Sequence, residues 1–368
     1  MHKVRVKPHW EISTDAGGPL DTATLLQLLV SIQKTGSISQ AAREVNLSYR
    51  YAWGLLRDGE TLFGEALMQT GRGRGTTLTA LAEKLVWADR RIGARLSPIL
   101  ESLASELEGE LNKIFADKLS MIRMSASHGF AVAALLALMI EAHLPIELNY
   151  RNSTDAVIAL ARRECDLAGF HVPLGKFETA AFAMYAGWLD SQSHCLIQLT
   201  IRAQGLFVAV GNPKNIHSLS DLTQAGVRFV NRQAGSGTRR LLELMLADAE
   251  ISPNEISGFE SAEFTHSAVA AYIASGMADV GFGVQTAADR FGLEFLPMVR
   301  ERYFFALPIA AIHAPLVQQV LGLMKTQAYH AALNALPGYE PSDTGRILTL
   351  KEAFGEAAFD ANKPTLAG

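Results

Sequence analysis

The chain has 368 residues, of which 49% are hydrophobic and 19% charged, and its formal net charge is −4. This length predicts two or three domains, and the composition excludes a disordered protein. Basic residues outnumber acidic ones in the first 95 residues, whereas acidic residues dominate the remainder. This imbalance indicates a nucleic-acid-binding module joined to a module that binds another class of ligand.

The sequence gives no sign of export or of membrane insertion. Its longest apolar run, FAVAALLALMI at residues 130–140, has the length of a core helix and not of a bilayer span. The first residues, MHKVRVKPHWEIS, contain no apolar signal core, so we expect a cytoplasmic protein without a membrane partner. Cys165 and Cys195 show no metal or redox spacing and are expected to be reduced thiols. We expect no covalent cofactor and no bare metal cation.

Three short helical patterns open the chain. The stretch DTATLLQLLVSIQKTG places apolar residues on one face and ends at Gly36, and SISQAAREVN follows with Ser37 as an expected N-cap. A tight turn then leads into YRYAWGLLRDGETLFG, which completes a helix-turn-helix pattern. A third helix in this position meets base edges and phosphates with its N-terminal end. The expected DNA contacts are Ser37, Ser39, Gln40, Ser48, Tyr49, Arg50 and Tyr51.

A basic hairpin is expected after the third helix. Residues 67–69 and 76–78 are able to pair around GRGRG, which carries Arg72 and Arg74 at its tip. Such a wing is suited to phosphate or minor-groove contact, although a solvated loop with incidental arginines has the same sequence. The three helices and this hairpin together favour a winged helix-turn-helix over residues 1–78, with double-stranded DNA as its partner.

A long helical pattern connects the two modules over residues 79–117. Leucines and isoleucines recur at steps of three, four and seven, as in a coiled-coil seam, and Pro98 is expected to kink or divide the helix. The helix either packs on its own domain or pairs two subunits. Because a two-fold DNA site requires dimer contacts, we expect a homodimer through residues 79–97, with tetramerisation left open.

The second module, residues 118–345, alternates strands and helices. The strand patterns LSMIRMSASHG, IELNYRNST and DLAGFHVP are separated by helical segments, which predicts parallel units in an open α/β sheet. Ligands of such sheets bind at the carboxyl ends of the strands. The polar residues expected there are Ser125, Ser127, His128, Asn152, Ser153 and Thr154. Residues 346–368 are expected to form a C-terminal helix and a mobile tail.

The segment FVNRQAGSGTRRLLELML indicates a strand, a tight turn and a helix. Glycines allow the close turn, and the free N–H groups and dipole of the helix start favour an anion. An ordinary N-capped helix is the alternative, and this segment alone does not exclude it. The expected ligand contacts are Arg232, Gly235, Ser236, Gly237 and Thr238, with Thr265 and His266 at a further helix start.

Five side chains near the expected ligand site have more than one interpretation or a structural one. His128 and His266 are either ligand donors or structural residues, and the sequence leaves both interpretations open. His171 is expected to be structural because it lies beside Pro173, and Arg239 is expected to point into solvent. Tyr303 is either a hinge residue or a ligand contact.

Residues 21–80 resemble the winged helix of LysR-type regulators, and more closely that of ModE-type regulators. The resemblance is carried by GSISQAAREVNLSYRYAWGLL, LFGEALMQT and the glycine-arginine wing followed by TTLT. Gly59 departs from the pattern, since it interrupts a helix that usually continues.

Residues 120–325 resemble the type II periplasmic-binding-protein fold, which has two lobes. The motifs SASHG, NRQAGSGTR, THSAVAAYIASGMADVGFG and FLPMVRERYFFALP carry this likeness. The resemblance implies a ligand such as molybdate, tungstate or a molybdenum-cofactor-related molecule, held by hydroxyls and backbone N–H groups.

The combined expectation is a ligand-responsive DNA-binding transcription regulator whose small anionic effector is an oxoanion. A small organic anion such as formate is the alternative, because every DNA-binding feature would be the same. An α/β enzyme is disfavoured, since no nucleophile elbow or orienting carboxylate accompanies Ser127, His128 or His266.

Overall fold

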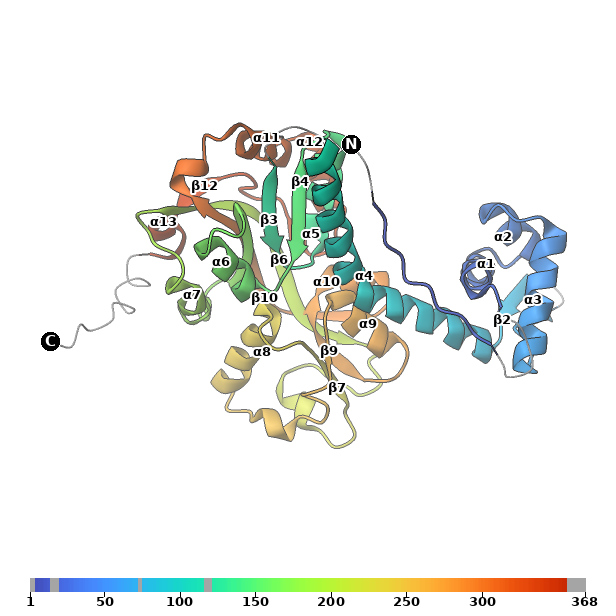
Figure 1. Ribbon diagram of the computed structural model, residues 1–368. Helices are drawn as coiled ribbons and strands as arrows, with labels where there is room; N and C mark the ends of the chain where they lie inside the picture. The colour runs from blue at the N-terminus through green and yellow to red at the C-terminus, as the bar shows by residue number, and fades with distance from the viewer. Residues whose placement is uncertain (1–3, 14–19, 72–74, 116–120, 356–368) are drawn as a thin grey trace. The chain divides into compact units, whose positions relative to one another are not determined.

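The computed structural model describes residues 4–13, 20–71, 75–115 and 121–355 (Figure 1). The chain divides into one compact unit over Lys7–Leu96 and a second formed by Met1–Val6 with Ser97–Gly368. None of the helices in the described ranges combines the length and apolar character that a membrane crossing requires.

The Lys7–Leu96 unit is a three-helix bundle with a two-stranded wing. Its elements are α1 (Thr22–Thr35), α2 (Ile38–Glu44), α3 (Tyr49–Phe63), β1 (Met68–Gly71) and β2 (Gly75–Leu78). The strands pair antiparallel, and the N–H of Thr76 donates to the Gly36 carbonyl, which joins the wing to the end of α1. This arrangement confirms the expected winged helix-turn-helix. Arg72 and Arg74 at the tip lie outside the described residues.

Gly59 does not interrupt α3, contrary to the expectation from its sequence. The helix continues to Phe63, and Gly59 is buried within it. A Cβ at Gly59 would lie 2.9 Å from Leu67 Cδ1 and 3.1 Å from Leu25 Cδ2. The glycine is therefore explained by close packing, because its missing side chain leaves room for two core leucines.

The connecting helix α4 (Ala80–Phe115) is not divided at Pro98. Pro98 is buried, and the next turns are attached to the edge strand β4 (Ile146–Tyr150). The Ser102 and Ser105 hydroxyls accept hydrogen bonds from the backbone N–H groups of Tyr150 (2.8 Å) and Leu148 (2.7 Å). Packing and these bonds offset the hydrogen bond that a proline removes from a helix.

A ten-stranded mixed sheet organises the second unit. Its strands run in the order β4, β3 (Ile122–Ala126), β5 (Leu167–Pro173), β10 (Glu294–Pro308), β6 (His194–Val208), β9 (Val280–Val284), β7 (Phe229–Arg232) and β8 (Ala262–Glu263), with β11 (Tyr339–Glu340) and β12 (Ile347–Thr349) also paired to β6. The first lobe contains parallel β3, β4 and β5, and the second contains parallel β7, β8 and β9. These parallel groups confirm the two-lobed α/β architecture.

Two strands of 15 residues each, β6 and β10, cross from one lobe to the other as an antiparallel pair. Tyr303, which was expected to be a hinge residue or a ligand contact, lies on one of these crossing strands, β10. The register sets Arg202 opposite Glu301, and Tyr303 opposite His171 of β5. Charged and polar side chains are thereby placed at the centre of the sheet.

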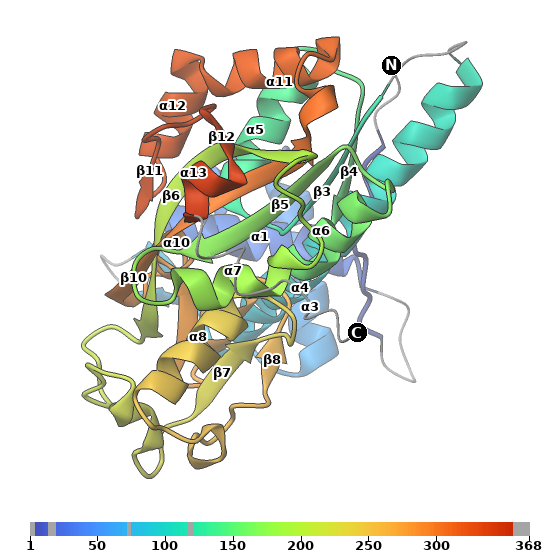
Figure 2. The same ribbon diagram turned by 90° about the vertical axis from the view of Figure 1, so that its left-hand side faces the viewer.

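Helices cover both faces of the first lobe (Figure 2). One core lies beneath α5 (Phe130–Glu141), α11 (Pro315–Met324) and α12 (Gln327–Asn334), and another beneath α6 (Ser153–Ala161), α7 (Glu178–Ala186) and α13 (Leu350–Phe354). The second lobe has its own core beneath α8 (Gly237–Asp248), and it also carries α9 (His266–Ala274) and α10 (Gln285–Arg290). Short 3-10 turns occur at Ser220–Thr223, Pro253–Glu255 and Ile309–Ala311.

Candidate functional site

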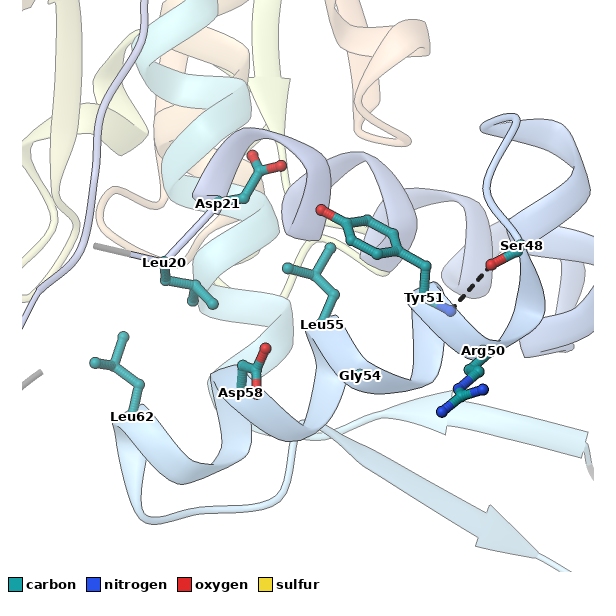
Figure 3. A pocket seen from close by; sticks show the side chains of 9 residues that line it. All are labelled: Leu20, Asp21, Ser48, Arg50, Tyr51, Gly54, Leu55, Asp58 and Leu62. Carbon is teal, nitrogen blue, oxygen red and sulfur yellow. Dashed lines mark hydrogen bonds between the residues drawn. The ribbon is translucent and has the colours of Figure 1, made fainter. Parts of the chain in front are cut away.

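The N-terminal end of α3 presents the side chains that were predicted to contact DNA (Figure 3). Ser48 caps the helix by accepting a hydrogen bond from the Tyr51 N–H at 3.2 Å. Tyr49, Arg50 and Tyr51 are exposed, so an arginine and two aromatic rings face solvent at the start of the helix. This is the position from which a recognition helix reaches the major groove.

The second helix contributes less exposed surface to this face. Ser37 caps α2 by accepting from the N–H of Gln40 at 3.4 Å, which confirms the expected cap. Gln40 is exposed, whereas Ser39 is only half-exposed. The exposed residues of α3 therefore offer the larger contact surface.

A shallow hollow lies beside this face, between α3 and the residues that precede α1 (Figure 3). Asp21 and Asp58 line it together with Arg50, so its charges are mixed and do not favour an anion. A different cavity, in the second unit, brings together the polar residues expected to bind ligand.

That cavity lies where the two lobes of the second unit meet, and most of the predicted ligand residues line it. These are Ser127, His128, Asn152, Ser153, Arg232, Ser236, Gly237, Thr238 and His266. The cavity is small, with about 20 Å³ of space for the centre of a water molecule, which is room for about one water. Segments separated by more than 100 residues thus converge on one enclosed polar space.

Three helices begin at this cavity. Asn152 caps α6 by accepting from the Asp155 N–H, Ser236 caps α8 by accepting from Arg239, and Thr265 caps α9 by accepting from Ala268. The first residues of these helices, Ser153, Gly237 and His266, all line the cavity. Helix starts carry partial positive charge and free N–H groups, so the cavity receives the positive ends of three helices.

Gly235 allows the helix starts of the two lobes to approach each other, whereas Gly237 has room for a side-chain carbon at ordinary contact distance. Gly235 has a positive φ of 79°, and a Cβ there would lie 3.2 Å from Asn152 Nδ2. A Cβ on Gly237 would lie 3.5 Å from Ser153 Oγ. The GSGT turn of the second lobe is therefore fitted against the start of α6 in the first lobe.

Two buried arginines make the cavity cationic. Arg202 pairs with Glu301 at 2.5 Å and donates to the Tyr339 hydroxyl at 3.3 Å. Burial opposes the Arg202 charge, but Glu301 and Tyr339 outweigh burial and raise the pKa of this guanidinium. Glu301 does not line the cavity itself, and the described lining contains no carboxylate.

Among the residues that the structure describes, Arg232 has no comparable counter-ion. Its Nη2 donates to the Phe264 carbonyl at 2.7 Å, while its Nε is buried without a hydrogen-bond partner. Burial and, to a smaller extent, the neighbouring Arg202 charge lower the pKa of Arg232 to about 9, against the opposing effect of Glu301. A buried, incompletely satisfied guanidinium is costly, and an anion in the cavity would supply the missing partner.

Three histidine rings complete the lining. Burial lowers the pKa of His171 and His266 well below the ordinary value, and the charges of Arg202 and Arg232 add to this effect. Burial also lowers the pKa of His128, against the opposing charge of Glu101 on α4. The three rings are therefore neutral at neutral pH. His171 Nε2 and His266 Nδ1 have no hydrogen-bond partner.

Four predicted ligand residues do not line the cavity. Ser125 is buried beside Cys165, where burial raises the pKa of the thiol against a hydrogen bond from the Ser125 hydroxyl. Thr154 points its hydroxyl into the interior without a partner, while Gly235 and Thr265 act through turn shape and helix capping. Side chains alternate along a strand and rotate around a helix, so only part of each polar cluster faces the ligand space.

Several lining residues were not predicted as ligand contacts, namely Arg151, His171, Arg202, Gln233 and Phe264. His171 was expected to be structural, but its buried ring contributes to the lining. The sequence did contain a signal for Arg202 and its partner, because Arg and Glu are almost never fully buried unless paired. Both interrupt strands that are otherwise rich in apolar residues.

Arg239 corrects a further expectation. It is 9% exposed and does not point freely into solvent. Its guanidinium pairs with Glu243 at 3.1 Å and with Glu260 at 3.0 Å. The first arginine of the GSGTRR segment is thus neutralised by two carboxylates. No group of three or more His, Cys, Asp or Glu residues within the described chain is placed to hold a metal ion.

Two family models match the chain. Residues 23–83 match the model described as "Bacterial regulatory helix-turn-helix protein, lysR family", and residues 137–325 match the "PBP superfamily domain". The second match covers the segments that supply the three helix starts and both buried arginines.

Curated relatives and a solved structure were also compared. The "Uncharacterized protein YvgK" of Bacillus subtilis is 33% identical over 201 residues, or 54% of this chain. The "Molybdenum transport protein ModE" of Azotobacter vinelandii is 30% identical over 175 residues, or 45% of this chain. The chain spans 64% of the length of each of these relatives. Oxidized Corynebacterium glutamicum OxyR aligns over 88% of this chain and 96% of its own, with 13% identity and a TM-score of 0.38.

Proposed function

We propose that this chain, which belongs to the PBP superfamily and carries the lysR-family regulatory helix-turn-helix, is a transcription regulator that senses a small oxoanion. The family matches confirm the resemblance to LysR/ModE-type regulators that the sequence motifs indicated. The LysR/ModE-type regulators are DNA-binding proteins and not enzymes, in agreement with the sequence analysis. Because its proposed target is DNA, we place the protein in the cytoplasm.

The observation that carries the oxoanion proposal is the composition of the cavity. Hydroxyls, helix N-termini and two buried guanidiniums line it, and the Nε of Arg232 lacks a partner. Oxoanions accept hydrogen bonds on every oxygen, so a cavity rich in donors suits them. Similarity to a molybdenum transport protein supports molybdate or tungstate as the effector.

Calorimetric titration tests the ligand directly. The purified full chain, freed of oxoanions, would be titrated with molybdate, tungstate, sulfate, phosphate and formate in turn. We expect molybdate or tungstate to bind with a micromolar or tighter dissociation constant and formate to give no comparable heat. Heat with formate alone would replace the oxoanion by the small organic anion, while absence of binding by all five would contradict an anion sensor.

Lobe closure offers a mechanism for the response. The predicted ligand contacts come from α6 in the first lobe and from α8 and α9 in the second. An anion held by both lobes binds the closed arrangement more tightly than the open one, which is the condition for shifting the equilibrium. A coupling of about 1–3 kcal/mol is enough to change the affinity for DNA severalfold or more.

The α3 start is proposed to contact DNA through Arg50. Replacing Arg50 by alanine is expected to weaken binding to duplex DNA and to reduce the slope of log affinity against log salt concentration by about one. Fluorescence anisotropy of a labelled duplex at several salt concentrations measures both quantities. Arg346→Ala, an exposed arginine of the second unit, is the matched control. An unchanged salt slope in the Arg50 variant would remove this residue from the interface.

A homodimer is proposed through the outer face of α4. Ile99, Leu103 and Leu107 are 48%, 50% and 47% exposed and recur every four residues on one helix face. The expected dimer segment was 79–97, but Ala82 and Val86 there pack into the core of their own unit. A second copy of the same row would cover the exposed one.

Leu103→Glu is expected to shift the protein from dimer to monomer in sedimentation velocity, because it places a charge in an apolar contact. Glu83→Gln, an exposed change on the same helix outside the row, should leave the dimer intact. A Leu103→Glu protein that sediments as the wild type would exclude this face as the dimer contact.

A further inference from the structure

The cavity proposed to hold an anion is lined by three imidazole rings, which are able to take up protons as well as form hydrogen bonds. His128 follows β3, His171 lies on β5 and His266 begins α9, and all three line the cavity. Histidine is the side chain whose charge changes most readily near neutral pH. A ligand that alters the charge in the cavity therefore acts on groups that are able to take up a proton.

His171 is the ring most completely surrounded by cavity groups. Its Nδ1 lies 3.4 Å from both the Ser127 and the Ser153 hydroxyls. Its Nε2 lies 4.0 Å from Glu301 Oε1 without a hydrogen bond. The two ring nitrogens thus face two hydroxyls on one side and a carboxylate on the other.

An aromatic ring and several charged or titratable side chains on neighbouring elements also surround His171. The Tyr303 ring of β10 contacts it edge-on, with a centroid distance of 4.2 Å. Arg202 of β6 and Arg232 of β7 oppose a positive charge on His171. His171 and His266 also oppose each other's positive charge. Only Glu301, among these neighbours, favours an imidazolium.

The balance of these charges changes when a dianion enters. Without a ligand, the Arg202 and Arg232 guanidiniums outnumber the neighbouring Glu301 carboxylate, while the charge of the lining residue Arg151 is paired with Glu164. The local charge is therefore positive and the ring stays neutral. Two negative charges from the ligand reverse the sign of the local potential, and Coulomb interactions are strong in a buried site. The cost of placing a proton on an imidazole then falls.

We infer that the cavity binds a doubly charged oxoanion together with one proton from solvent, and that the His171 ring carries this proton. The inference rests on the proposed oxoanion-sensing function. In the protonated ring both nitrogens are donors. Nδ1–H donates to the oxygens of Ser127 and Ser153, whose own hydroxyl hydrogens are then free to donate to the ligand. Nε2–H faces Glu301.

The uptake of one proton determines how the affinity for the anion depends on pH. The bound state holds one more proton than the free state, so the gain in affinity is fully present at pH values below the free-state pKa of His171. That pKa is lowered well below 6.5 by burial and by the two arginines, and ligand raises it. Affinity should therefore fall as pH rises from the free-state pKa to the bound-state pKa, by about tenfold per pH unit for one linked proton.

The experiment is calorimetric titration of the full chain with molybdate and, separately, sulfate, which remains a dianion over this range. Titrations in buffers of different ionisation enthalpy, between about pH 6 and about pH 8.5, give the number of protons taken up. We expect uptake that approaches one proton in the lower part of this range, and a matching decline of affinity as pH rises.

His171→Gln keeps a polar side chain but removes the titrating ring. We expect this variant to bind the anion without proton uptake and with an affinity independent of pH, whereas His313→Gln, at an exposed histidine, should behave as the wild type. Should His171→Gln fail to fold, NMR titration of the wild-type imidazole resonances with and without sulfate tests the same assignment.

The outcomes separate this inference from the function on which it depends. Binding whose heat is independent of the buffer, with a flat pH profile, overturns the proton-linked mechanism and leaves the oxoanion sensor standing. Proton uptake that persists in His171→Gln, or a wild-type His171 resonance that ligand leaves unprotonated, overturns the assignment to His171. Absence of binding by every oxoanion overturns the proposed function and the inference together.

Discussion

Replacing Arg232 by methionine is expected to weaken oxoanion binding strongly without destabilising the protein. The guanidinium is buried, its Nε has no hydrogen-bond partner, and burial lowers its pKa to about 9. Removing one partner of a desolvated charge contact costs about 2–5 kcal/mol of binding, so affinity should fall at least about 30-fold. Calorimetry with molybdate measures this loss.

The stability of the same variant provides an independent check. Methionine has a similar volume and no charge, and such replacements of buried ions are commonly neutral or stabilising by about 1–4 kcal/mol. Thermal unfolding of the ligand-free variant should therefore begin no lower than that of the wild type. Arg240→Met is the control, because Arg240 lies on the surface of α8 and pairs with Glu243. Unimpaired binding in Arg232→Met would show that the anion does not depend on this guanidinium.

Glu301→Gln is expected to destabilise the unliganded protein strongly. The carboxylate is 1% exposed and pairs with Arg202, which is 3% exposed. Breaking a buried pair leaves an uncompensated charge and costs about 3–5 kcal/mol, which corresponds to a fall in Tm of roughly 10 °C for a unit of this size. Differential scanning fluorimetry measures the shift.

Oxoanion should restore part of the stability that Glu301→Gln loses, because the ligand then becomes the counter-charge for both arginines. The rise in Tm on adding molybdate should exceed that of the wild type. Glu340→Gln is the matched control in the same sheet, since Glu340 forms a half-exposed pair with Arg300. Such surface pairs contribute about 0–1 kcal/mol. Equal shifts in the two variants would mean that the Arg202–Glu301 pair has no special role beneath the cavity.

The positions of Arg232 and of the Arg202–Glu301 pair link ligand binding to lobe closure. Arg202 and Glu301 lie on β6 and β10, the strands that cross between the lobes. Arg232 ends β7 in the second lobe. An anion that contacts both arginines therefore connects the crossing strands with the second lobe, and its charge acts where the lobes meet.

The local elements were largely determined by the sequence. Ser37 caps α2 as expected, because a short polar side chain before an apolar-periodic segment satisfies the free N–H groups of the first turn. The winged helix and the parallel strands of each lobe followed from periodicity and spacing in the same way. Such features depend on neighbours within a few residues.

Other features were decided by packing between distant segments. Gly59 and Pro98 looked like helix interruptions, yet core leucines fill the space at the first, and burial and anchoring to β4 support the helix at the second. Local propensity is a weak influence that tertiary contacts readily override. The antiparallel crossing of β6 and β10 was likewise not apparent from either strand alone.

The residues of the candidate site also fall into two groups, those identified from the sequence and those placed there by tertiary structure. The sequence by itself identified the GSGT turn, Arg232 and the hydroxyl-rich helix starts, because capping and anion affinity are properties of short segments. Only the tertiary structure brought His171 and Arg202 to the same cavity and placed Glu301 behind them, since these residues lie on strands whose register joins segments about 100 residues apart. Burial then sets their charges, and burial is a property of the folded chain rather than of any stretch of its sequence.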